Sequence, residues 1–182
     1  MDENRLIQRC RRGDSEAFDR LYAQYSKPLF NFIYRLVNDH ELSCDLLQDT
    51  FLKILIGPYE SRGKFSTWIY KVATNLCLNE IVKAKRTVPL EEDPPNPRDS
   101  PSQEMERKEL SQKIEKAISS LPTQQRVAFC LRNYQGIPYG EIASLLECPL
   151  GTVKSRIHCA VQNLKSYLEE YHEMRGDSEE TP

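Results

Sequence analysis

Hydrophobic residues recur along most of this chain every three or four positions, the spacing of one face of an α-helix. In the first half this pattern and its turn signals predict four helices, at about Glu3–Arg12, Ser15–Leu36, Ser43–Ile56 and Ser66–Lys85. In the second half they predict four more, at about Glu104–Ser119, Pro122–Asn133, Tyr139–Leu146 and Pro149–Glu170. No alternation typical of strands is present, so we expect an all-α fold.

Short polar or glycine-containing segments indicate where the first helices begin and end. Gly13 is a typical residue for ending a helix, and Asp14 or Ser15 can cap the next one. Pro28 is expected to kink that second helix or to restart it. Asn38 and Asp39 indicate a turn, and Gly57-Pro58 should end the third helix.

A proline-rich segment divides the chain into two halves. Residues 87–103 are acidic and contain Pro89, Pro94, Pro95, Pro97 and Pro101. These prolines exclude a continuous helix and favour an extended linker, which at ~3.3 Å per residue spans at most ~55 Å. We therefore expect one helical domain over 1–86, a linker over 87–103, a second domain over 104–170 and a disordered tail over 171–182. A surface loop within one domain is the alternative.

Composition and charge restrict the function classes. The formal net charge is -2, so any DNA-binding surface must be local. The six cysteines form no C-x-x-C pair, which predicts free and mostly buried thiols and no metal site. Three histidines without an acid–base constellation, and no phosphate-cradling loop, predict no enzyme, no cofactor and no small-molecule substrate. The acidic start and the lack of a long apolar run predict a cytoplasmic protein.

The segment from Tyr139 to Leu168 predicts a helix-turn-helix. Its first helix has one apolar face, and ECPLG turns the chain, with Cys148 at the N-cap and Pro149 at the first helical position. Small Ala143 allows the two helices to cross closely. In such a motif the second helix enters a major groove of DNA. The inner face of that helix is expected to comprise Val153, Ile157, Ala160, Val161 and Leu164.

The outward face of the second helix carries side chains suited to DNA. Lysine and arginine contact phosphates or guanine, and serine and glutamine suit bases or sugars. The alternative is an ordinary helical hairpin with a solvated basic face. The predicted DNA-contacting residues are Thr152, Lys154, Ser155, Arg156, His158 and Gln162.

A different stripe lies on the predicted helix Ser43–Ile56. Asp45, Gln48, Asp49 and Leu52 fall at i, i+3, i+4 and i+7 and therefore share a face opposite the apolar one. An acidic and amide stripe with one exposed leucine suits docking onto a basic partner helix. Periodicity alone, however, favours an ordinary solvated face.

Cations and aromatic residues alternate around the fourth predicted helix, as in sites for single-stranded DNA. Trp68, Lys71 and Asn75 lie at i, i+3 and i+7, and Arg62 and Lys64 precede them. The alternative is that the aromatic residues fill the core, which we accept for Phe65 and Ile69. The interleaved aromatic residues are Tyr59, Phe65, Trp68 and Tyr70.

Three motifs resemble those of the extracytoplasmic-function sigma factors of bacterial RNA polymerase. Asp45, Gln48, Asp49 and Phe51 match D-x-x-Q-[DE]-x-F, and FSTWIYKVATN over 65–75 resembles the family's −10 segment. GTVKSRI over 151–157 also resembles the LuxR-type regulators. Leu121-Pro122, Arg126 and Gly136 upstream of it are similar to the sigma pattern instead.

The resemblance implies an alternative sigma factor that binds core RNA polymerase and opens promoter DNA. It implies that Asp45, Gln48, Asp49 and Leu52 bind the clamp helices of the largest subunit, and that the second domain binds the flap and reads the −35 element. It also implies an anti-sigma partner, which in this family is usually membrane-tethered. Asn75 matches the asparagine of the pocket for a flipped −10 base, beside Arg62, Lys64, Trp68 and Lys71.

Cys159 departs from the family, in which many members carry arginine there. We expect a weaker or shifted −35 preference for that reason. Two other classes stay open: a helix-turn-helix regulator that binds duplex DNA without polymerase, and a sigma-mimicking adaptor that binds a partner protein. The first would need neither the Asp45–Leu52 stripe nor the Trp68 and Asn75 face.

Overall fold

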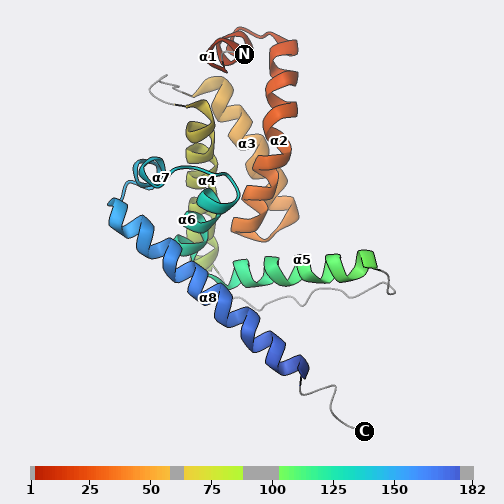
Figure 1. Cartoon of the computed structure of the whole chain (residues 1–182). Helices are drawn as coiled ribbons and strands as arrows, with labels where there is room; N and C mark the ends of the chain where they lie inside the picture. The colour runs from red at the N-terminus through yellow and green to blue at the C-terminus, as the bar shows by residue number, and fades with distance from the viewer. Residues whose placement is uncertain (1–2, 58–63, 88–102, 177–182) are drawn as a thin grey trace.

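All regular structure is helical in the computed structural model, which describes residues 3–57, 64–87 and 103–176 (Figure 1). This confirms the expected all-α fold, although most of the expected linker and the last residues of the expected tail lie outside the described residues. The helices are α1 (Glu3–Arg11), α2 (Ser15–Val37), α3 (His40–Ile56), α4 (Phe65–Thr87), α5 (Gln103–Ser120), α6 (Thr123–Asn133), α7 (Tyr139–Leu145) and α8 (Leu150–Gly176).

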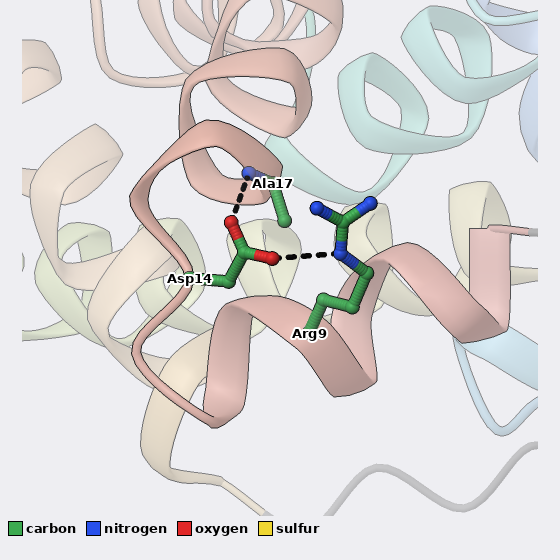
Figure 2. A network of polar contacts seen from close by, with 3 residues as sticks. All are labelled: Arg9, Asp14 and Ala17. Atoms are coloured by element: carbon green, nitrogen blue, oxygen red, sulfur yellow. Dashed lines mark hydrogen bonds and ion pairs between the residues drawn. The ribbon is translucent and has the colours of Figure 1, made fainter.

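A sharp corner joins α1 to α2. Gly13 has a φ of 86°, a left-handed conformation that glycine adopts without steric cost. Asp14 then caps α2: its carboxylate accepts from the backbone N–H of Ala17 at 3.1 Å and from Nε of Arg9 at 2.7 Å (Figure 2). These two hydrogen bonds, the backbone one first, lower the pKa of Asp14 below its ordinary value. The corner therefore depends on an ionised Asp14.

The second helix runs unbroken through Pro28, so the expected restart at this position is wrong. Tyr25, Leu29 and Phe32, on both sides of the proline, are buried on one face. Pro28 and Gln24 are exposed, so water can reach the Gln24 carbonyl that lacks its helical donor. Tertiary packing of the apolar face thus keeps the helix continuous.

The third helix begins at His40, three residues before the expected start. Asn38 ends α2 with a φ of 55°, and the Asp39 side chain accepts from the N–H of Leu42 at 2.9 Å. Gly57 is the C-terminal capping residue of α3, and its N–H donates to the carbonyl of Lys53. Only glycine fits there without a shift, because an added Cβ would lie 2.4 Å from that carbonyl oxygen. The end of this helix is therefore fixed by glycine, as the sequence predicts.

The last helix differs from the expectation at both ends. Pro149 precedes α8, and its carbonyl accepts from Thr152 and Val153, so the cap lies one residue later than expected. At the other end α8 continues to Gly176, so residues 171–176 are helical where we expected a disordered tail. Residues 171–175 contain no helix breaker, which explains the extension.

The two halves of the chain pack on one another. Helix α2 contacts α5 and α6, and α4 contacts α7 (Figure 1). The buried residues form one continuous cluster that includes Leu29, Phe32 and Cys77 from the first half and Cys130 and Leu131 from the second. The halves therefore share a core.

Asp14 generates the first prediction. Asp14→Ala removes both the cap and the partner of Arg9, whereas Asp14→Asn keeps an acceptor and removes only the charge. We expect the thermal midpoint of unfolding, followed by circular dichroism, to fall by several degrees for Asp14→Ala and by less for Asp14→Asn.

The pH dependence of the thermal midpoint separates the effect of the Asp14 charge from that of its hydrogen bonds. Because the folded-state pKa of Asp14 is lowered, ionisation stabilises the fold fully above the unfolded pKa, and that stabilisation disappears as pH falls through the folded pKa. The gap in thermal midpoint between the natural chain and Asp14→Asn should shrink from about pH 5 to about pH 3. A gap that stayed constant over this range would contradict the role of the charge.

Candidate nucleic-acid and partner interfaces

Helix α3 exposes the predicted stripe as one continuous face. Asp45, Gln48 and Asp49 are exposed, and Leu52 is 54% exposed. The opposite face is buried, as predicted, and comprises Leu46, Leu47, Phe51 and Ile54. An exposed leucine beside acidic and amide groups is the arrangement from which the sequence predicts docking onto a basic helix.

Sequence reasoning missed two features at the end of α3. Ile56, four residues after Leu52, is 84% exposed and extends the apolar part of the face. Its spacing from Leu52 is a signal that could have found it. Arg11 of α1 donates to the carbonyl oxygens of Ile54 at 2.9 Å and Gly57 at 2.5 Å. No local pattern predicts this contact, because its partners are more than forty residues apart.

Helix α4 separates its core residues from its predicted DNA-binding residues. Phe65 and Ile69 are buried, as expected, whereas Lys64 and Asn75 are exposed and Trp68 and Lys71 are half-buried. The side chains of Trp68, Lys71 and Asn75 thus share a face that solvent reaches. Arg62 and Tyr59 lie outside the described residues.

The structure corrects the prediction for Tyr70, which the sequence pattern placed among the aromatic residues of a DNA-binding site. It is only 5% exposed, and its ring packs edge-on against Phe32 with centroids 5.1 Å apart. Burial raises the pKa of Tyr70 to about 12. It therefore belongs to the core and is not available to stack on a base.

Two lysines, Lys64 just before α4 and Lys71 within it, are paired with carboxylates of the second half. Lys64 lies 3.7 Å from Glu141, and Nζ of Lys71 donates to Glu147 at 3.0 Å. Between them, the hydroxyl of Thr67 donates to the carboxylate of Glu141. Both acids belong to the helix-turn-helix, at the start of α7 and in the turn after it. No local sequence pattern predicts these contacts, because the paired residues are more than seventy positions apart.

Beside these contacts, the packing of α2, α4 and α6 buries cationic and thiol groups. The guanidinium of Arg35 lies 3.9 Å from the centre of the Tyr134 ring, a cation–π contact. Burial raises the pKa of the Cys77 and Cys130 thiols to about 12 each. Burial also lowers the pKa of Arg126, whose charge lies near both thiols.

The other cysteines differ from these. Cys10 is also buried, but Cys44, Cys148 and Cys159 are half-buried, so the expectation of mostly buried thiols holds for half of them. All six are free thiols.

Helices α7 and α8 form the predicted helix-turn-helix. Ile142 and Leu145 of α7 and Val153, Ile157 and Ala160 of α8 are buried. The turn contains Glu147 at a φ of 51°, and the N–H of Cys148 donates to the carbonyl of Ala143 at 3.1 Å. The two helices therefore pack as the sequence predicts.

Val161 is an exception to the inner face predicted for α8. It is 46% exposed, because it follows Ala160 by about 100° around the helix and lies at the edge of the buried stripe.

The outer face of α8 presents the predicted DNA-contacting residues. Lys154, Ser155, His158 and Gln162 are exposed, and Thr152 is half-buried. Arg156 is also half-buried, and its guanidinium donates to Sγ of Cys148 at 3.6 Å, which turns it back toward the turn. Cys159 lies half-buried beside His158.

The described ranges contain no cluster of three metal-ligating side chains. Among the helices described here, none has the length and apolar composition needed to cross a membrane.

Family models match both halves of the chain. The model of sigma-70 region 2 matches residues 21–87, which include the α3 face and the α4 face. The model of sigma-70 region 4 matches residues 111–164, which include the helix-turn-helix.

Curated relatives match nearly the whole chain. The RNA polymerase sigma-H factor of Pseudomonas aeruginosa is 32% identical over 181 residues, covering 92% of this chain and 94% of that protein. The ECF RNA polymerase sigma-E factor of Haemophilus influenzae is 29% identical, covering 93% of this chain and 96% of that protein.

Solved structures share the fold. The sigma factor RpoE of Bartonella quintana, solved in complex with the anti-sigma factor NepR, has a TM-score of 0.68 and 25% identity. The match covers 84% of this chain and 96% of that one. CnrH, solved with the cytosolic domain of CnrY, has a TM-score of 0.67 and 20% identity, covering 91% of this chain and 96% of that one.

With region 2 and region 4 in the family's order, and a relative at 32% identity matched along nearly its whole length, this chain belongs to the extracytoplasmic-function sigma factors, the alternative sigma factors that direct RNA polymerase.

Proposed function

We propose that three faces of this sigma factor divide the work of promoter opening. The α3 face, consisting of Asp45, Gln48, Asp49 and Leu52, binds the clamp helices of the largest polymerase subunit. The α4 face, consisting of Arg62, Lys64, Trp68, Lys71 and Asn75, binds the opened −10 strand. The α8 face, consisting of Thr152, Lys154, Ser155, Arg156, His158 and Gln162, reads the −35 element.

The observation that carries the proposal is the separation of chemistry on the surface. On α3 the exposed groups are acids, an amide and a leucine, which suit a basic partner helix. On α4 exposed Lys64 and Asn75 lie beside half-buried Trp68 and Lys71, a combination that suits phosphates and an unstacked base. On α8 they are short polar and basic groups on a helix that can lie in a major groove.

Promoter opening then needs no chemistry by the chain itself. The contacts of an extruded base with Trp68 and Asn75 offset the free energy of a few kcal/mol that unstacking the base costs. A helix-turn-helix regulator acting alone is not favoured, because it has no use for the half that matches region 2. The partner polymerase also implies that the protein acts in the cytoplasm.

Two further partners follow from the family. We propose that the second half contacts the flap of the second-largest polymerase subunit. We also propose an anti-sigma factor as a regulator, in the membrane-tethered form usual in this family. The similar Bartonella quintana sigma factor was solved with its anti-sigma factor NepR, which supports such a partner here.

Core binding is tested by a charge placed in the α3 face. Leu52→Lys places a cation at the apolar end of the proposed contact, where it opposes a basic partner helix, and we expect its affinity for core polymerase to fall by about tenfold or more. Val82→Lys is the matched control, because Val82 is an apolar residue of similar exposure, 49%, on a different helix, α4. Co-elution on a sizing column and run-off transcription with core enzyme measure the effect. Equal loss in both variants, or no core-dependent transcript from the natural chain, would contradict the proposal.

Strand capture is tested at Asn75. We expect Asn75→Ala to lower run-off transcription by about fivefold or more while core binding stays unchanged, because the flipped base loses a hydrogen-bonding partner. Asn31→Ala, at another exposed asparagine in the middle of a long helix, should transcribe normally. Permanganate reactivity of unpaired −10 thymines shows whether opening is the step affected. Normal opening by Asn75→Ala would contradict the assignment.

The −35 face is tested at Cys159. We expect Cys159→Arg to strengthen holoenzyme binding to a responsive promoter severalfold, because it adds a cation beside His158. A promoter with a scrambled −35 element is the control: a phosphate contact keeps the gain there and a base contact loses it. Unchanged affinity on both templates would show that Cys159 does not face DNA.

A further inference from the structure

We infer that the free chain closes on itself, with Glu141 and Glu147 held where the phosphates of the −10 strand would bind on α4. The inference rests on the proposed role of the α4 face. It adds a competitor for that face, namely the α7 end of the chain's own helix-turn-helix. Promoter DNA must displace these two carboxylates before it can occupy the face.

The contacts lie along one line at the start of α4. Lys64, which directly precedes the helix, and Thr67 and Lys71 within it are spaced at i, i+3 and i+7. Each has a carboxylate partner from the other half: Glu141 for Lys64 and Thr67, and Glu147 for Lys71. Ammonium and hydroxyl donors recognise carboxylate and phosphate oxygens with the same hydrogen bonds. The two acids thus use the donors that a DNA backbone needs.

The closed arrangement does not depend on surface ion pairs alone, because residues of both halves are also buried against one another. Cys77 of α4 and Cys130 of α6 are fully buried in the shared core. Arg35 of α2 covers the ring of Tyr134, which follows α6. These contacts hold the two halves at the distance that lets Glu141 and Glu147 reach α4.

The other two faces stay accessible in the closed arrangement. On α3, Asp45, Gln48, Asp49 and Leu52 are exposed, and on α8, Lys154, Ser155 and His158 are exposed. Closure therefore pairs Lys64 and Lys71 with carboxylates and leaves the proposed polymerase-binding face free. Core polymerase can dock first on α3, and the halves separate afterwards as DNA reaches α4.

The ion pairs are weak enough to be reversible. The Lys64 side chain is 71% exposed and that of Glu147 is 77% exposed, so water screens both pairs. Ion pairs of small interaction free energy increase the population of the closed form but still allow the chain to open. We therefore expect opening mutations to change DNA affinity by a modest factor.

The test measures binding of the full-length free chain to a fluorescent single-stranded oligonucleotide of mixed sequence, about 12 nucleotides long. Glu141→Gln/Glu147→Gln removes both carboxylates, and we expect it to bind about threefold to tenfold more tightly than the natural chain at low salt. Glu41→Gln/Glu169→Gln changes the net charge equally at two exposed positions that make none of these contacts. It should stay within about twofold of the natural chain. Equal affinity of the two double variants would overturn the inference.

A charge exchange gives a second readout that does not involve DNA. Trp68 is the only tryptophan of the chain and lies next to Thr67, so its quenching by acrylamide reports on this face. Lys71→Glu places two acids together and should increase quenching, whereas Lys71→Glu/Glu147→Lys restores an opposite pair and should reverse it. Identical quenching in the natural chain and both variants would also overturn the inference.

The outcomes separate this inference from the proposed function. A natural chain that supports core-dependent run-off transcription, with no gain in oligonucleotide affinity for Glu141→Gln/Glu147→Gln, overturns the closed arrangement alone. A gain in affinity without any core-dependent transcript supports the closed arrangement and overturns the promoter role.

Discussion

The buried stripe of α4 is the constraint on which the rest of the structure depends. Phe65, Ile69, Ala73 and Cys77 repeat every four residues and are at most 1% exposed, so the rotation of the helix about its axis is fixed. That rotation turns Lys71 and Asn75 outward. The same stripe ends at Cys77, in the core shared with α6, so one helix sets both the proposed DNA-binding face and the packing of the two halves.

Local chemistry made most of the helices predictable. Gly13, Asp14 and Gly57 act within one turn of the helix ends that they define, so a linear sequence contains the needed information. Errors arose where tertiary packing outweighed a local signal. The helix through Pro28 is held by buried Leu29 and Phe32, which lie on the face that the core covers. No local rule weighs that burial against the missing hydrogen bond.

The candidate faces were predictable to the same extent. Periodicity alone separated Asp45 and Leu52 from the core, because a buried stripe leaves the other side of a helix exposed. It was ambiguous at Tyr70 and Val161, which lie at the edges of their stripes. Periodicity could not predict the contact of Lys71 with Glu147 or that of Arg11 with Gly57. These partners are 76 and 46 residues apart and meet only in the folded chain.

The proposed DNA-binding face belongs to a chain in which acidic residues slightly outnumber basic ones, with a net charge of -2. Two of its lysines, Lys64 and Lys71, lie against Glu141 and Glu147 in screened surface ion pairs. A tight pairing would prevent promoter binding, whereas no pairing would leave a cationic, aromatic face open to any nucleic acid. Two exposed ion pairs lie between tight pairing and no pairing. They can be displaced because polymerase and promoter together make many more contacts than these two. In the closed arrangement that we propose, the weakness of these two ion pairs would let a promoter presented by polymerase open the chain, whereas other DNA would not.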